Sequence, residues 1–280
     1  MANYEKRGYL VQQFKIFRIK DYLSPLKFHY HSFHKIIIFI SGEVTYTIEG
    51  KSYPLIPRDI IFVSAGEIHR PTATGNKLYE RIVIYISPEY LQKYSHANED
   101  LARCFSSAAQ HSSVMHLTAG KSHDLLFHLE KLERNFHAKG FASDLYSEIL
   151  FIEFMILLNR ALLSHEIDDM HFAVYDKKIL PILKYINDNL FDELSIDSLA
   201  EKFFISKFHM MRRFKTATGY SIHQYITSKR LLQARTLLHS DLSLTKICFD
   251  CGFRDYSTFS RAFKELFQQT PSEYRQKIPN

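Results

Sequence analysis

The chain has 280 residues, of which 46% are hydrophobic and 24% charged; this composition is ordinary for a globular protein and the length allows two domains with separate cores. Three cysteines and the absence of a long apolar run mean that neither a disulfide framework nor a membrane span is expected. The start of the sequence has no secretory pattern, so a cytoplasmic protein is predicted.

The first half of the chain is rich in short strand-like runs. Lys35–Ile40 is apolar and β-branched, Val44–Ile48 alternates between apolar and polar residues, and Glu49–Lys51 is typical of a turn. Asp59–Ser64 and Arg81–Ser87 are further expected strands. Several short strands at similar spacing favour a small β-barrel or jelly roll.

This strand-rich region carries a histidine-rich segment and a Pro-Arg-Asp turn at 57–59, and over residues 15–90 it resembles cupin-like sensor domains. Metal-binding cupins have a His-x-His, a carboxylate four residues later and a further histidine. His29, His31 and His69 stand in matching places, but Lys35 replaces the carboxylate. An ammonium repels a cation, so no metal is predicted, although three imidazoles with an open position remain an alternative.

The same residues suit an organic ligand, because sugar-sensing members of the resembling family bind one in this barrel without metal. Histidines 29, 31, 34 and 69 and Lys35 would donate hydrogen bonds to a polar or anionic ligand, between stacking surfaces from Phe28, Tyr30, Phe33 and Tyr46. The alternative is that some of them only line the solvent face of a strand. The predicted ligand-binding residues are His29, His31, Lys35, Tyr46 and His69.

Two helices are predicted at 121–137 and 143–164. The first has a narrow apolar seam of Leu125, Leu129, Leu132 and Phe136. The second is apolar nearly all round, so it is expected to be buried. In the resembling family such a pair docks on the barrel and forms a dimer, with packing inside one chain as the alternative. An acidic linker is expected at 164–176.

The last third of the chain repeats itself, because 194–225 and 242–274 share one pattern of apolar, basic and capping residues. Each copy predicts a short helix, a turn and a second helix, with Ser195, Ser206 and Asp255 as N-caps. The second helix of each copy has an outward basic and polar stripe, which suits the DNA major groove; a solvated charged face is the alternative. The predicted DNA-binding residues are Lys207, Phe208, Met211, Arg212, Lys215, Arg254, Tyr256, Ser257, Thr258, Ser260, Arg261 and Lys264.

Residues 251–264 and 270–275 (Thr-Pro-Ser-Glu-Tyr-Arg) resemble the C-terminal signature of AraC/XylS-type transcription regulators. The resemblance covers about the last hundred residues and implies two helix-turn-helix units joined by a helix, here Ile222–Leu238. It also implies double-stranded DNA, a small-molecule effector such as a sugar or related metabolite, a second copy of the chain and RNA polymerase as partners. Gln268 departs from the family, which usually has glycine there.

Charge supports this division of the chain. Residues 177–280 hold 17 Lys and Arg against 10 Asp and Glu, so the positive excess lies in the repeated region, as phosphate binding requires. Cys248 and Cys251 form a C-x-x-C, but with no second pair to complete a zinc site they are expected to be packed in the core.

The sequence therefore predicts an α+β protein, with a cupin-like barrel and helical pair at 1–165 for ligand sensing and dimerisation. An all-α domain with two helix-turn-helix units follows at 177–280. The predicted function is a ligand-responsive transcription regulator, most simply an activator, and not an enzyme. The alternatives are a cupin-type metalloenzyme with an accessory DNA-binding tail and an architectural DNA-binding protein without a ligand.

Overall fold

The computed structural model describes residues 10, 12–96, 99–110, 112–117, 122–163 and 173–277. The chain divides into two compact units: one holds most residues up to Val174, and the other holds Glu49–Lys51 together with the chain from Tyr175 onward. The first is rich in strands and the second is built of helices, which confirms the predicted α+β class. Most of the predicted linker, 164–172, lies outside the described residues. No described helix is both long enough and apolar enough to cross a membrane.

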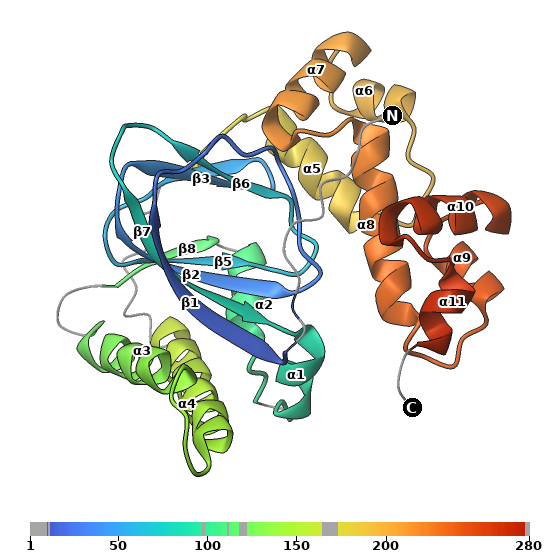
Figure 1. Ribbon diagram of the computed structural model, residues 1–280. Coiled ribbons are helices and arrows are strands. Elements are labelled where there is room, and N and C mark those ends of the chain that lie inside the picture. The colour runs from blue at the N-terminus through green and yellow to red at the C-terminus, as the bar shows by residue number, and fades with distance from the viewer. Residues whose placement is uncertain are drawn as a thin grey trace. The chain divides into compact units, whose positions relative to one another are not determined.

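The described strands form two β-sheets. One has the strand order β1-β7-β2-β5-β8 and the other β6-β3-β4-β9. Figure 1 shows β3 and β6 lying across from β2 and β5. The strands are β1 (Phe14–Asp21), β2 (His34–Ser41), β3 (Val44–Ile48), β4 (Lys51–Pro54), β5 (Asp59–Val63), β6 (His69–Ala73), β7 (Tyr79–Ile86), β8 (Val114–His116) and β9 (Val174–Tyr175).

The turn predicted at Glu49–Lys51 is confirmed, and it joins the neighbouring strands β3 and β4. Glu49 and Gly50 have φ angles of 46° and 78°, so both central residues of the turn lie in the left-handed region. A two-residue turn of this type matches the twist of the flanking strands.

Strand β2 separates two cores, because its side chains alternate between the faces of the sheet. Ile36 and Ile38 pack into a core shared with the helices of this unit. Ile37 and Phe39 point the other way, into a core between the two sheets that also holds Tyr46. By the same alternation Lys35 belongs to the inner face, between the sheets.

The described part of this unit contains four helices: α1 (Pro88–Lys93), α2 (Arg103–Gln110), α3 (Ser122–Phe136) and α4 (Ser143–Leu163). The predicted pair corresponds to α3 and α4, which lie together below the five-stranded sheet in Figure 1. Their buried side chains join the outer core, and the predicted seam on α3 contributes to it: Leu125, Leu129 and Leu132 are buried, and Phe136 is partly buried.

Helix α4 is buried on one face only. Phe151, Phe154 and Leu158 are fully buried, but Leu145, Ile149, Ile156 and Leu163 are 58%, 54%, 36% and 50% exposed. The expectation that this helix is buried all round is therefore wrong for the single chain. The exposed residues are spaced four, seven and seven apart, which places them along one stripe of the helix.

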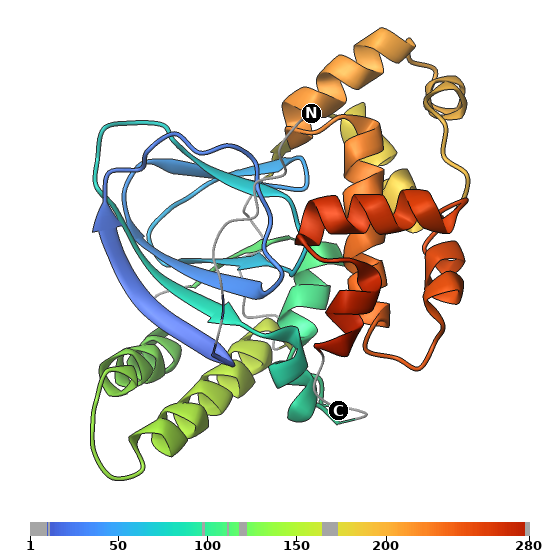
Figure 2. The ribbon, with the colours of Figure 1, turned by 45° about the vertical axis from the view of Figure 1, so that its right-hand side comes forward.

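The second unit is organised around α8, which has α7 at one end and α11 at the other in Figure 2. This unit contains α5 (Ile179–Asp188), α6 (Ile196–Lys202), α7 (Lys207–Thr218), α8 (Ile222–Leu237), α9 (Leu244–Asp250), α10 (Tyr256–Phe267) and α11 (Pro271–Gln276). Helices α6 and α7 form one helix-turn-helix unit and α9 and α10 the other, as the repeat predicts. Cys248 and Cys251 are both free and fully buried, which confirms core packing.

The N-caps follow the prediction with one difference. Ser195 accepts a hydrogen bond from the backbone N–H of Ser198, and Asp255 accepts one from that of Thr258. Ser206 occupies the N-cap position of α7, but its side chain makes no capping hydrogen bond. At the C-terminal ends, Gly219 and Gln268 adopt left-handed φ angles of 79° and 60°.

Replacing Gln268 by glycine is expected to stabilise the protein by about 0.5–1 kcal/mol, because the left-handed conformation costs a residue with a Cβ more than it costs glycine. Urea unfolding of the full chain would measure the gain. The matched control is Gln269→Gly, since Gln269 is not among the described positive-φ residues and should lose stability. A loss of stability in Gln268→Gly would contradict the strain argument.

Candidate functional site

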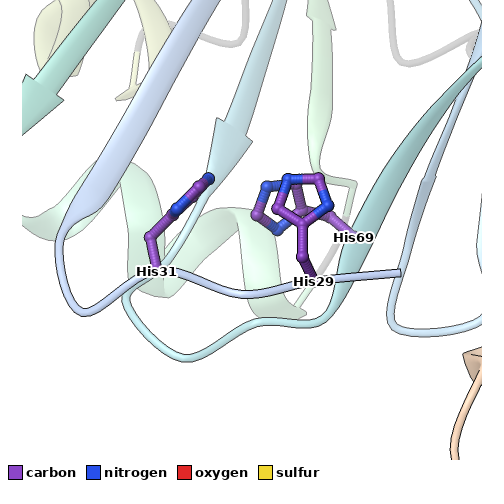
Figure 3. Close-up of side chains that lie close together, drawn as sticks. All are labelled: His29, His31 and His69. Carbon is purple, nitrogen blue, oxygen red and sulfur yellow. The ribbon is translucent and has the colours of Figure 1, made fainter. Parts of the chain in front are cut away.

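Three histidines from two separate segments meet at one end of the barrel. His29 and His69 form an isolated antiparallel bridge, in which each backbone N–H donates to the other residue's carbonyl at 3.1 and 2.9 Å. Their rings lie 4.4 Å apart between centroids, and the ring of His31 lies 4.8 Å from that of His69. Figure 3 shows the rings projecting to the same side of the loop that carries His29 and His31. All three side chains are buried.

Hydrogen bonds set the tautomers of two of these rings. The Nδ1 atoms of His29 and His69 lie 2.9 Å from the carbonyl oxygens of Lys27 and Glu67. Because a carbonyl can only accept, each Nδ1 carries the proton, and Nε2 of the neutral ring is an acceptor. The Nε2 atom of His69 is buried and has no hydrogen-bond partner among the described residues. Burial and then the charge of Lys35 hold the pKa of His69 well below its usual value, so this ring is neutral at pH 7.

Lys35 and Tyr46 complete the cluster from the inner faces of β2 and β3. Lys35 Nζ donates to the hydroxyl of Tyr46 at 3.4 Å, and the ring of Tyr46 stacks on that of His69 with centroids 5.9 Å apart. Burial lowers the pKa of Lys35 to about 7, and Arg81 adds repulsion in the same direction. The structure thus brings the five predicted ligand-binding residues to one place.

The structure places only part of the wider predicted set beside the cluster. His34 lies on the outer face of β2, where its ring stacks on Phe105 at 4.2 Å and its Nδ1 accepts from the backbone N–H of Ala65. It therefore faces away from the cluster, as the alternation with Lys35 requires. Phe33 does belong nearby, since its ring stacks on His31 at 4.7 Å.

Tyr85 is a neighbour of the cluster that the sequence analysis missed. It pairs with Lys35 across β7 and β2, Lys35 Nζ lies 5.9 Å from the centre of its ring, and its ring is also 5.9 Å from that of His31. The position of Tyr85 could have been predicted from the alternation of side chains along β7, because Tyr85 shares a face with Arg81 and Val83.

Imidazoles in their neutral form are suitable ligands for a transition metal, and one ring nitrogen from each of His29, His31 and His69 lies within 4.8 Å of the others. The fourth group is unsuitable, because Lys35 supplies no negative charge and opposes a cation when it is protonated. With its proton on Nδ1, the ring of His69 presents the Nε2 lone pair, which can coordinate a metal or accept a hydrogen bond. Because Lys35 opposes a cation, the cluster favours a ligand that donates a hydrogen bond to His69. This differs from the expectation that the histidines donate, and the reason is the proton held at each Nδ1.

The predicted DNA-binding residues lie on the two second helices and at their N-terminal ends. On α7, Met210 and Phe214 are buried, Phe208 is 84% exposed, and Arg212 and Lys215 are exposed. On α10, Phe259 and Phe263 are buried, while Arg261 and Lys264 are exposed. The remaining predicted residues are exposed or half-buried: Lys207, Met211, Arg254, Tyr256, Ser257, Thr258 and Ser260.

Two of the basic residues have acidic neighbours on the surface. Lys207 contacts Asp197, and Arg254 contacts Glu193, in ion pairs whose side chains are more than half exposed. Exposed pairs of this kind contribute little and exchange readily, so both cations remain accessible to phosphate.

The matches to protein families cover both units. A model of an AraC-like ligand binding domain matches residues 20–155, and a model of a helix-turn-helix domain matches residues 199–277. The chain belongs to the AraC-type transcription regulators. Its similarity to individual members extends over most of the sequence. The HTH-type transcriptional activator RhaS of Shigella sonnei (strain Ss046) is 29% identical over 250 residues, which are 89% of this chain and 87% of that protein.

RhaS of Enterobacter sp. (strain 638) is similar to this AraC-type regulator to the same extent, with 29% identity over 250 residues, covering 89% of this chain and 87% of RhaS. Among solved structures, an AraC-type DNA-binding regulator from Chromobacterium violaceum is 29% identical, covers 37% of this chain and 95% of its own, and gives a TM-score of 0.34.

Proposed function

We propose that this AraC-type regulator is an activator that binds a small polyhydroxylated effector, such as a sugar or related metabolite, at His29, His31, Lys35, Tyr46 and His69. The buried acceptor on His69, without a partner among the described residues, carries the proposal. A hydroxyl can donate to this nitrogen, whereas a carboxylate cannot. The aromatic rings of Tyr46 and Tyr85 suit the apolar faces of a sugar ring.

We assign operator binding to the second unit. Arg212 and Arg261 hold equivalent places in the repeat, and both are exposed on the second helix of a helix-turn-helix unit. In this proposal the arginines bond guanine, Lys215 and Lys264 contact phosphate, and Phe208 and Met211 meet thymine methyls. The activator names of the relatives support RNA polymerase as a further partner.

The proposal assigns sensing and dimerisation to residues 1–165 and DNA binding to 177–280, with action in the cytoplasm and no enzymatic step. The relatives are named as transcription regulators, which supports this over a cupin-type metalloenzyme. Metal analysis of the purified protein is expected to find well under one divalent ion per chain. A stoichiometric metal that is lost in His31→Ala would favour the metalloenzyme instead.

The effector site can be tested by removing one hydroxyl group. Mass spectrometry of the natively purified protein identifies the bound molecule, and the thermal shift that it produces is then measured. Tyr46→Phe is expected to weaken binding by about tenfold, because it removes the donor and acceptor next to Lys35 and His69. The matched control is Tyr53→Phe, since Tyr53 belongs to the same core but its hydroxyl accepts from the backbone N–H of Ser113. Equal effects of the two changes would contradict the site.

We propose that α4 forms the homodimer through its exposed stripe of Leu145, Ile149, Ile156 and Leu163. An apolar stripe of this length, with its spacing of four and seven residues, suits a copy of the same helix.

Ile149→Glu is expected to raise the dimer dissociation constant by about 100-fold, since it places a charge in an apolar contact. Ile56→Glu is the control, because Ile56 is 47% exposed and lies outside the stripe. Sedimentation at micromolar concentration compares both with the parent chain. A parent chain that is monomeric under these conditions would refute the dimer.

A further inference from the structure

Arg230, on α8, donates hydrogen bonds to three backbone carbonyls at once. Its Nε is 2.8 Å from Leu190 O, its Nη1 is 2.7 Å from Gly252 O, and its Nη2 is 2.7 Å from Asp192 O. The planar guanidinium presents its donors in a fixed fork, so these three bonds hold three carbonyls in a defined arrangement.

The three carbonyls lie in two separate segments of the chain. Leu190 and Asp192 lie in the segment that follows α5 and leads into α6, at the entrance to the first unit. Gly252 lies in the turn between α9 and α10, inside the second unit. One side chain therefore connects the segment before the first unit to the turn of the second. We call these residues, Leu190, Asp192, Arg230 and Gly252, the junction.

Gly252 allows the two backbones to approach closely. Its φ angle is +77°, and a Cβ placed there would lie 2.6 Å from the carbonyl oxygen of Phe191 and 3.0 Å from Cζ of Arg230. Both the conformation and the space therefore require glycine. The contact is made by backbone atoms, which cannot adjust by changing a rotamer.

Next to the junction, a cleft of about 760 Å³ lies between the two helix-turn-helix units. Its walls are the segment that leads into α6, one side of α8, and the first turns of α10; they include Ser195, Thr227 and Thr258. Side chains do not fill the space between the units there. Their mutual orientation in this region consequently depends on α8 itself, on the junction and on the exposed ion pair between Arg254 and Glu193, which contributes little.

We propose that Arg230 is a positioning residue that sets the distance and angle between the two recognition helices, and so the spacing of the base pairs that the protein selects. The inference rests on the proposed function, in which α7 and α10 each read a cluster of base pairs. Along B-DNA one base pair adds about 3.4 Å and a tenth of a turn, so a rigid junction cannot follow a changed spacing.

The test uses the full chain. An operator is selected from random DNA, and affinity is measured for that sequence and for versions with one base pair inserted or deleted between the two clusters. The parent protein is expected to lose affinity by about 10- to 100-fold on either change, comparable to a misplaced base contact. Arg230→Lys keeps the charge but loses the fork, so it is expected to lose less than about threefold on the same changes.

Arg275→Lys is the matched control. Arg275 also donates to a carbonyl, that of Leu242 at 2.7 Å, but neither residue belongs to the junction. This variant should keep the spacing preference of the parent. Gly252→Ala is a second variant at the junction, should Arg230→Lys not fold, and it is expected to broaden the accepted spacing as well.

A parent protein that tolerates an inserted base pair would overturn the inference without any variant. The same holds if the junction variants keep the full spacing penalty while binding weakens uniformly. If the parent selects no sequence from random DNA, the proposed reading of DNA by α7 and α10 fails, and the inference fails with it.

Discussion

Replacing Arg261 by alanine is expected to relax base preference at one cluster of operator positions, and replacing Arg212 should do so at a second cluster about one helical turn away. Each change should cost about 1–3 kcal/mol of discrimination, which is the contribution of a bidentate bond from arginine to guanine. Both side chains are exposed on the stripe opposite the buried residues of their helices. Selection of sites from random DNA by each variant measures the effect.

Lys215→Ala and Lys264→Ala are the controls within the same helices. Both lysines lie one turn further along and are exposed. Because they are assigned to phosphate, their loss should weaken binding to all sequences and lower the slope of affinity against salt by about one. If the arginine variants behave like the lysine variants, with an unchanged preferred sequence, the arginines contact phosphate and the reading face is wrongly assigned.

Lys35→Met is expected to remove a pH dependence of stability. The pKa of Lys35 is 10.5 in an unfolded chain and about 7 in the folded protein, so between these values the unfolded state binds more protons. Stability of the parent chain should therefore rise with pH above 7, by about 2 kcal/mol between pH 7 and 9. The rise comes from relief of the penalty for burying the ammonium.

Urea unfolding followed by the near-ultraviolet circular dichroism of tyrosine measures this slope, since the chain has no tryptophan. Lys77→Met is the control, because Lys77 is 70% exposed and pairs with Glu43 at 2.6 Å on the surface. It should keep the slope. Above pH 9 the stability of all three chains is lowered by a shared contribution, because burial raises the pKa of Cys104 and this thiol then ionises in the unfolded state. A slope that survives in Lys35→Met would place its origin elsewhere.

The helical repeat could be predicted well from the sequence, because a period of 3.6 residues separates Phe259 and Phe263 from Arg261 without any knowledge of the tertiary fold. The N-caps Ser195 and Asp255 could also be predicted, because a cap depends only on residues that are close in the sequence. The convergence of His29 and His69 was predictable only through the family resemblance, since forty residues separate them and a backbone bridge brings them together.

Other features depend on tertiary packing and could not be obtained in this way. The helices α1 and α2 are short, and few periodic positions mark them. Whether Ile149 is covered by its own chain or by a second copy is not encoded in hydrophobicity. In contrast, the placement of His34 could have been predicted from the sequence, because side chains alternate along a strand and His34 therefore lies on the face opposite Lys35.

In the proposed function, effector recognition and assembly depend on opposite faces of β2, so each could change independently during evolution. Positions 35, 37 and 39 border the inner core, while positions 36 and 38 pack toward the helices that carry the exposed stripe of α4. In this proposal, a substitution that adapts the inner-face residues to a new metabolite leaves the support of α4 in place. Paralogues that arise by gene duplication could then acquire new inducers along this one strand and still pair as before.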